Sequence, residues 1–168
     1  MHPSSQPRYH TRLRHSGPCL TVLVVDDNRS LAENLSEILT HEGYACATVN
    51  DGDAAIAHLQ RERFDLVLTD LQMLPTDGLA VVAAARRMSR DTPIVLMTGF
   101  ADEDQRRAAR DAGATEILDK PFDSQSLVQS VHRWLRSRLD DRPRLSPAWP
   151  DHARVRPAII ASLCELRS

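Results

Sequence analysis

Five polar side chains stand at the ends of short apolar runs in this sequence, although they are far apart along the chain. They are Asp26, Asp27, Asp70, Thr98 and Lys120. If the apolar runs are parallel strands, their carboxyl ends meet at one edge of a sheet, and these side chains would share a site. Carboxylates crowded into one cleft repel each other, so protons or a cation must reduce their charge. The set therefore predicts a site that takes up a cation.

The types of the side chains indicate which cation and which chemistry to expect. Oxygen donors without a neighbouring histidine or cysteine favour a hard ion, and Mg²⁺ is the natural candidate. Magnesium binds through one or two carboxylates together with phosphate oxygens. With an ammonium and a hydroxyl beside it, the site could bind a phosphoryl group, and a carboxylate could form an aspartyl-phosphate. The sequence has no glycine-rich GxxxxGKS or GxxxxGKT loop, so nucleotide binding is not expected.

The ammonium of this set comes from an unusual residue. The chain has 21 basic residues, and Lys120 is the only lysine among them. A compact ammonium on a flexible stem fits among carboxylates as a point charge, whereas a planar guanidinium is bulkier and needs a fork-shaped partner. Lysine at this one position indicates a geometry that excludes arginine.

The elements that would position these residues follow from the apolar pattern. Short β-branched runs predict five strands, and the segments between and after them have the apolar spacing of amphipathic helices. This alternation is typical of an α/β fold with a five-stranded parallel sheet, doubly wound, with helices on both faces. The predicted strands cover residues 20–25, 44–49, 64–71, 93–98 and 116–120.

Composition divides the chain into four parts. Residues 1–19 lack apolar periodicity and are predicted to be a flexible arm, and residues 20–139 form the predicted domain. Residues 140–156 are rich in proline, which is typical of a linker. Residues 157–168 place apolar side chains on one helical side, which predicts a short amphipathic helix. We expect this helix to dock on the domain or on a second copy.

Charge and cysteine content exclude several classes of protein. The net charge of −2 gives no general attraction to nucleic acid or to an anionic membrane. No apolar run approaches the ~20 residues that span a bilayer. The 3 cysteines form no CxxC pair, so neither a zinc ribbon nor a disulfide framework is indicated. We expect a cytoplasmic protein without membrane or direct nucleic-acid contacts, and a stand-alone domain with a tail too short for a complete output domain.

The runs "VLVVDDN", "DLVLTDL", "DGL", "VLMTG" and "LDKPF" occur in this order at the ends of the predicted strands. Over residues 20–139 the chain thereby resembles the receiver domain of two-component response regulators. The resemblance implies a flavodoxin-like fold that accepts a phosphoryl group from a histidine kinase or a histidine phosphotransfer protein. It also implies signalling by protein contact, with a second copy of the chain as one candidate partner. Such a domain is no enzyme beyond its own phosphotransfer and slow autodephosphorylation.

The same resemblance implies a role for each site residue. Asp70 would be the phosphoacceptor, Thr98 the switch hydroxyl, and Lys120 the partner first of the acid cluster and then of the phosphate. The Lys120–Pro121 peptide bond would be cis. The Mg²⁺ ligands would be Asp26, Asp27, Asp70 and the backbone carbonyl of Gln72.

Two alternatives belong to other functional classes. A constitutive binding module of the same fold would use the same surface without phosphorylation. A hydrolase of the haloacid-dehalogenase type also has an aspartate nucleophile, but it needs a second acidic residue two places later, where this chain has Gln72. Taken singly, each site residue also has an ordinary interpretation: Asp26, Asp27, Asp70 and Thr98 as cap or turn residues, and Lys120 as a chance surface lysine.

The sequence departs from the family pattern in two places. The usual run after the phosphoacceptor is D-x-x-M-P-x-x-D-G, and here the proline falls one place late, at Pro75. The total length to Gly78 is kept, so we expect the loop to close. Ile117, three residues before the lysine, stands where the family commonly has an aromatic residue that moves inward on activation. The effect of both departures on switching is left open.

Overall fold

The computed structural model describes residues 20–99 and 101–140. These residues form five strands that alternate with five helices, as the apolar runs predicted. The strands are β1 (Thr21–Val25), β2 (Ala45–Val49), β3 (Leu66–Asp70), β4 (Ile94–Thr98) and β5 (Glu116–Asp119). The helices are α1 (Arg29–His41), α2 (Gly52–Arg61), α3 (Gly78–Met88), α4 (Glu103–Ala112) and α5 (Ser124–Asp140).

The strands form one sheet with the order β2-β1-β3-β4-β5, and every neighbouring pair is parallel. The chain steps from β1 outward to β2, returns to β3, and then continues toward the opposite edge. The direction of winding therefore reverses between β1 and β3, and open α/β sheets bind ligands beside the carboxyl ends of strands at such a reversal. The predicted doubly wound, flavodoxin-like architecture is confirmed.

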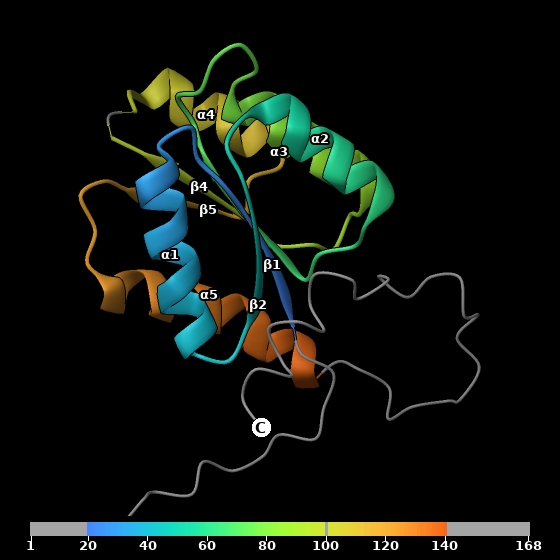
Figure 1. Ribbon diagram of the computed structural model, residues 1–168. Helices are drawn as coiled ribbons and strands as arrows, with labels where there is room; N and C mark the ends of the chain where they lie inside the picture. The colour runs from blue at the N-terminus through green and yellow to red at the C-terminus, as the bar shows by residue number, and fades with distance from the viewer. Residues whose placement is uncertain (1–19, 100, 141–168) are drawn as a thin grey trace, which may run out of the picture.

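The three central strands, β1, β3 and β4, bury side chains on both faces of the sheet. Along β1, Leu23 and Val25 belong to one apolar cluster, and Val22 and Val24 belong to the cluster on the other face. Helices α2, α3 and α4 pack on the first face, and α1 and α5 pack on the second (Figure 1). Because both faces are covered along these central strands, their residues are mostly apolar and do not alternate with polar ones.

The start of α3 is pressed against the end of β3. Asp77 caps the helix, since its side chain accepts a hydrogen bond from the backbone N–H of Ala80 at 2.9 Å. A Cβ atom on Gly78 would lie 2.0 Å from the backbone oxygen of Asp70, so only glycine allows the two backbones to approach so closely. This contact fixes the loop that follows Asp70.

Several predicted segments lie outside the described residues. They are the arm at residues 1–19, the terminal helix at residues 157–168 and all but the first residue of the linker at residues 140–156. Helix α5 continues to Asp140, one residue past the predicted end of the domain. Within the described part of the chain, no helix is both long and apolar enough to cross a membrane.

Candidate functional site

The carboxyl ends of four strands place the predicted site residues at one edge of the sheet. Asp70 is the last residue of β3 and Thr98 is the last residue of β4. Asp26 directly follows β1, and Lys120 directly follows β5. Because the strands are parallel and in register, with Asp70 opposite Met97 and Thr98 opposite Asp119, these residues lie at the same level of the sheet.

Lys120 connects two carboxylates that are distant in sequence. Its Nζ atom donates to Asp26 Oδ2 and to Asp70 Oδ1, both at 2.9 Å. Asp26 is 1% exposed and Asp70 is 6% exposed, whereas the lysine side chain keeps 22% of its surface in contact with solvent. A buried carboxylate is tolerated only when it is paired and hydrogen-bonded, so the ammonium is what permits this burial.

Backbone amides hold the remaining oxygen of each carboxylate. The N–H of Asn28 donates to Asp26 Oδ1 at 2.9 Å, and the N–H of Gln72 donates to Asp70 Oδ2 at 3.0 Å. The side chain of Asn50 also donates to the backbone oxygen of Asp26 at 3.0 Å. All four carboxylate oxygens therefore have a donor, and both side chains are fixed in orientation.

The electrostatics of the cluster leave Asp70 more basic than an ordinary aspartate. Burial raises the pKa of the Asp70 carboxyl, and the neighbouring Asp26 carboxylate adds to this effect against the opposing influence of Lys120 and the Gln72 N–H. Burial disfavours the charged form of Lys120, but its hydrogen bonds to Asp70 and Asp26 outweigh burial and raise the pKa of the ammonium. The lysine is therefore charged at neutral pH, and one ammonium faces two carboxyl groups.

Thr98 adjoins this cluster through its backbone. Thr98 is fully buried, and its carbonyl oxygen accepts a hydrogen bond from the backbone N–H of Lys120 at 2.6 Å. The Lys120–Pro121 peptide bond is cis. The end of β4 thus fixes the backbone from which the lysine side chain reaches the two carboxylates.

The fit of the site to Mg²⁺ rests on the donors that the structure brings together. Asp26 and Asp70 share the site, whereas Asp27 is exposed. Within residues 20–99 and 101–140, no three acidic, histidine or cysteine side chains are close enough together to hold a metal ion. The donors are all oxygens, and a single ammonium does not neutralise two carboxylates. The charge and the ligand type fit a hard cation, and the roles of Asp27 and of the Gln72 carbonyl as ligands stay predictions.

The loop between β3 and α3 closes although its proline is displaced. The N–H of Gly78 donates to the backbone oxygen of Leu71 at 3.0 Å, which joins the two ends of the loop. In its middle, the hydroxyl of Thr76 donates to Asp53 Oδ1 at the start of α2, at 2.6 Å. The Leu74–Pro75 peptide bond is also cis, which sequence reasoning did not predict.

Sequence reasoning also missed the two backbone donors of the site. Asn28 and Gln72 each contact a carboxylate two residues earlier through the N–H group. An aspartate followed two residues later by a loop residue is a common signal for an Asx turn, and this signal was available at both positions. It predicts a local contact, but it does not say that the contact orients a functional carboxylate.

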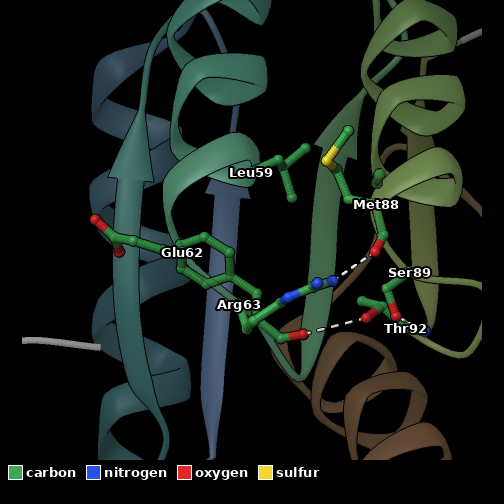
Figure 2. A pocket seen from close by; sticks show the side chains of 8 residues that line it. Leu59, Glu62, Arg63, Met88, Ser89 and Thr92 are labelled. Carbon is green, nitrogen blue, oxygen red and sulfur yellow. Dashed lines mark hydrogen bonds between the residues drawn. The ribbon is translucent and has the colours of Figure 1, made fainter. Parts of the chain in front are cut away.

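A hollow near the opposite edge of the sheet offers no second site of comparable chemistry. It lies between the ends of α2 and α3 and is lined by residues that include Leu59, Arg63, Met88 and Thr92 (Figure 2). Its volume is about 10 Å³, which admits one water molecule at most. Arg63 crosses it to donate to the backbone oxygen of Met88, so the hollow is a packing feature.

Comparisons with known proteins agree with this geometry. The family model of the response regulator receiver domain matches residues 22–132. The chain is 34% identical over 122 residues to Response regulator MprA of Mycobacterium leprae, which covers 73% of this chain and 54% of that protein. It is 37% identical over 117 residues to Transcriptional regulatory protein PrrA of Mycobacterium bovis, covering 70% of this chain and 50% of that protein.

A solved structure extends the likeness to three dimensions. Chemotaxis protein CheY4 of Vibrio cholerae superposes with a TM-score of 0.66 at 32% identity, covering 69% of this chain and 98% of that structure. The chain spans about half the length of the curated relatives described above. The name of PrrA as a transcriptional regulatory protein conflicts with the expectation that direct nucleic-acid contact is absent, and that expectation is withdrawn.

Proposed function

The chain belongs to the response regulator receiver domain family, and on this premise we propose that it is a phosphorylation-dependent signalling switch with Asp70 as its phosphoacceptor. One observation carries the proposal. Asp70 is buried at the carboxyl edge of the sheet, and both of its oxygens are held, one by Lys120 and one by the Gln72 N–H. A nucleophile whose orientation is fixed before the reaction needs little reorganisation to attack.

The proposed reaction has two steps. A carboxylate oxygen of Asp70 attacks the phosphorus of a phosphohistidine, a new O–P bond forms, and the N–P bond breaks with its electron pair returning to the imidazole nitrogen. Later a water molecule attacks the acyl phosphate, which restores the carboxylate and releases inorganic phosphate. Lys120 exchanges its contact with Asp70 for one with a phosphoryl oxygen, and Thr98 supplies a hydroxyl to another, because both lie at this edge of the sheet.

A bound Mg²⁺ would neutralise the negative charge that gathers when the phosphoryl group meets the acidic cluster. Asp26, Asp27, Asp70 and the Gln72 carbonyl are the proposed ligands. Asp26 already has one oxygen on a backbone amide and one on Lys120. Asp27 is exposed and is free to turn without unpacking the core, because it follows β1 in the connection to α1.

The proposed phosphodonor is a histidine kinase or a histidine phosphotransfer protein. The proposed output is a change in contact with a partner protein. The chain matches about half of each curated relative that is described above, so the output of those relatives is not transferred to it as a whole.

Labelling with acetyl phosphate and Mg²⁺ tests the acceptor. The wild-type chain should gain one phosphoryl group that is labile in acid and in base, as expected of an acyl phosphate, and it should be visible as a shifted band on a Phos-tag gel. Asp70→Asn should lose the band entirely, because the amide is a poor nucleophile. Asp91→Asn is the matched control, since Asp91 is an exposed loop aspartate, and it should label like wild type.

Two outcomes would contradict the proposal. Full labelling of Asp70→Asn would place the acceptor elsewhere. Absence of labelling in the wild-type chain, with both acetyl phosphate and phosphorylated kinases, would favour a constitutive binding module of the same fold.

Thermal melts test the metal ligands separately. Mg²⁺ should raise the melting temperature of the wild-type chain, because a ligand that binds only the folded state stabilises it by RT ln(1 + [L]/Kd). Asp27→Asn should reduce this shift. An unchanged shift would remove Asp27 from the ligand set without affecting the assignment of Asp70.

A further inference from the structure

Leu74 is a large apolar side chain that the fold leaves in water beside the site. It is 86% exposed, and Met88, at 40%, is the other large apolar side chain with substantial exposure among the described residues. A single exposed leucine is common on protein surfaces and needs no explanation by itself. Leu74 differs in its place, because it lies four residues after Asp70 in the loop that borders the acceptor.

The loop that carries Leu74 is anchored on both sides of it. On one side, the Gln72 N–H is bonded to Asp70, and the side chain of Met73 is only 3% exposed. On the other side, the Thr76 hydroxyl donates to Asp53 at 2.6 Å. The leucine therefore projects from a fixed backbone and does not sit on a free loop tip.

A glycine at the start of α2 allows this anchoring. A Cβ atom on Gly52 would lie 2.4 Å from the backbone oxygen of Thr76, so the loop rests directly on the backbone of the helix. In Figure 1 the loop is the green segment between β3 and α3, which projects beyond the carboxyl ends of the strands. The fold thus holds the loop tip outward at the edge where Asp70 lies.

We propose that Leu74 is a docking residue for the protein phosphodonor, which receives it in an apolar pocket beside its phosphohistidine. This inference rests on the proposed function and adds to it a residue that distinguishes protein donors from small ones. Asp70 is 6% exposed, so a histidine that reaches it must bring its own protein surface over the rim that Leu74 occupies. A small donor such as acetyl phosphate reaches the same carboxylate without covering the rim.

The anchoring also explains why one leucine can matter. An apolar side chain contributes to binding in proportion to the area that it buries, less the cost of immobilising it. Since Met73, Thr76 and Gly52 already hold the loop, most of the backbone ordering precedes binding. Leu74 is therefore a pre-ordered contact, and burying it requires little further ordering of the loop.

The test compares a protein donor with a small donor on the same variants. The protein donors are the catalytic cores of histidine kinases encoded in the same genome, phosphorylated with labelled ATP, and the fastest donor to wild type is used. The small donor is acetyl phosphate. The variants are Leu74→Ala, the conservative Leu74→Met, and Met88→Ala as the matched exposed control at the far end of α3, a helix about 15 Å long.

Leu74→Ala should lower the second-order rate of transfer from the kinase about tenfold, because each factor of ten corresponds to ~1.4 kcal/mol of lost contact. The rate with acetyl phosphate should stay at the wild-type value. Leu74→Met should restore most of the kinase rate, and Met88→Ala should match wild type with both donors.

Three results would overturn the inference. Equal kinase rates for Leu74→Ala and wild type would remove any role in docking. An equal loss with both donors would show that Leu74 supports the site and not the partner. A change in sedimentation with no change in kinase rate would assign the leucine to a second copy of the chain. Failure of the proposed function looks different, because then neither donor labels wild-type Asp70.

Discussion

Lys120 and Arg86 are two partly buried cations at opposite ends of this molecule. They donate hydrogen bonds to different kinds of acceptor. Lys120 donates to two carboxylates at the carboxyl edge of the sheet. Arg86, near the end of α3, donates to neutral acceptors from three segments. These acceptors are the backbone oxygens of Ser89, Arg90, Thr92 and Gly113 and the hydroxyl of Thr115.

The partners determine what each cation can do. The fork of Arg86 joins the loop after α3 to the end of α4 and the start of β5, and a planar guanidinium suits several acceptors in fixed directions. Backbone carbonyls cannot leave, so this contact is permanent while the fold persists. The acceptors of Lys120 are charged side chains, and a phosphoryl oxygen could take the place of one of them. Arg86 is therefore suited to holding the fold together, and Lys120 is suited to exchanging a carboxylate for a phosphoryl oxygen.

The largest expected effect concerns phosphorylation. Lys120→Met and Lys120→Arg should each lower labelling of Asp70 by acetyl phosphate about 100-fold or more, because a positioned cation at the reacting oxygen is lost or displaced. Arg86→Lys should label at the wild-type rate per folded molecule, measured with circular dichroism as a check on folding. If Lys120→Arg is labelled at the wild-type rate, a guanidinium serves as well as an ammonium at this site. The distinction drawn between Lys120 and Arg86 would then be wrong.

Stability should show the reverse order. Arg86→Ala should lower the free energy of unfolding by about 2–3 kcal/mol, because several partly buried carbonyls lose their donor. Arg87→Ala, the exposed neighbour on the same helix, should stay within ~0.5 kcal/mol of wild type in the same urea titration. If both variants lose the same stability, the contacts of Arg86 are not structural.

The pH dependence of stability sharpens the role of Lys120. Lys120→Met leaves Asp26 and Asp70 facing each other without a cation, so the pKa of Asp70 should rise further. A carboxyl whose folded-state pKa is raised stabilises the fold when protonated and loses that contribution as pH rises. At pH 7.5 the free energy of unfolding of Lys120→Met should be on the order of 2 kcal/mol lower than that of wild type. This loss is smaller than the loss expected when one partner of a fully buried ion pair is removed. Urea unfolding at pH 4.5 should show a smaller difference, and a difference that grows on acidification would contradict the argument.

The smallest expected effect concerns Thr98. Thr98→Ala should keep labelling within about threefold of wild type, because the contact to Lys120 uses the Thr98 carbonyl, which alanine retains. Amide exchange over residues 99–112 should respond to phosphorylation less than in wild type, and Thr98→Ser, which keeps the hydroxyl, should restore the response. Loss of labelling comparable to that of Asp70→Asn would make Thr98 part of the chemistry and not of the switch.

The sequence alone predicted the architecture and the edge of the sheet at which the site residues meet. The run that leads to Asp70 is mostly apolar because both faces of the sheet are covered, and this pattern is typical of a parallel sheet without knowledge of contacts. The unique lysine at Lys120 indicated a special position before any partner was known. Patterns of this kind are local, since they depend on the burial of each segment and not on its neighbours.

Only the tertiary structure decided how these residues meet. Lys120 bridges Asp26 and Asp70, which are 94 and 50 residues away, while Asp27 next to the first of them is exposed. The strand order places β1 between β2 and β3, and crossover connections set that order by packing helices on both faces. The network of Arg86 and the outward position of Leu74 depend likewise on loops that meet in space. A sequence pattern records whether a side chain is buried, but the partner of a charge is determined by the distances between elements, which arise only when the sheet and its helices pack together.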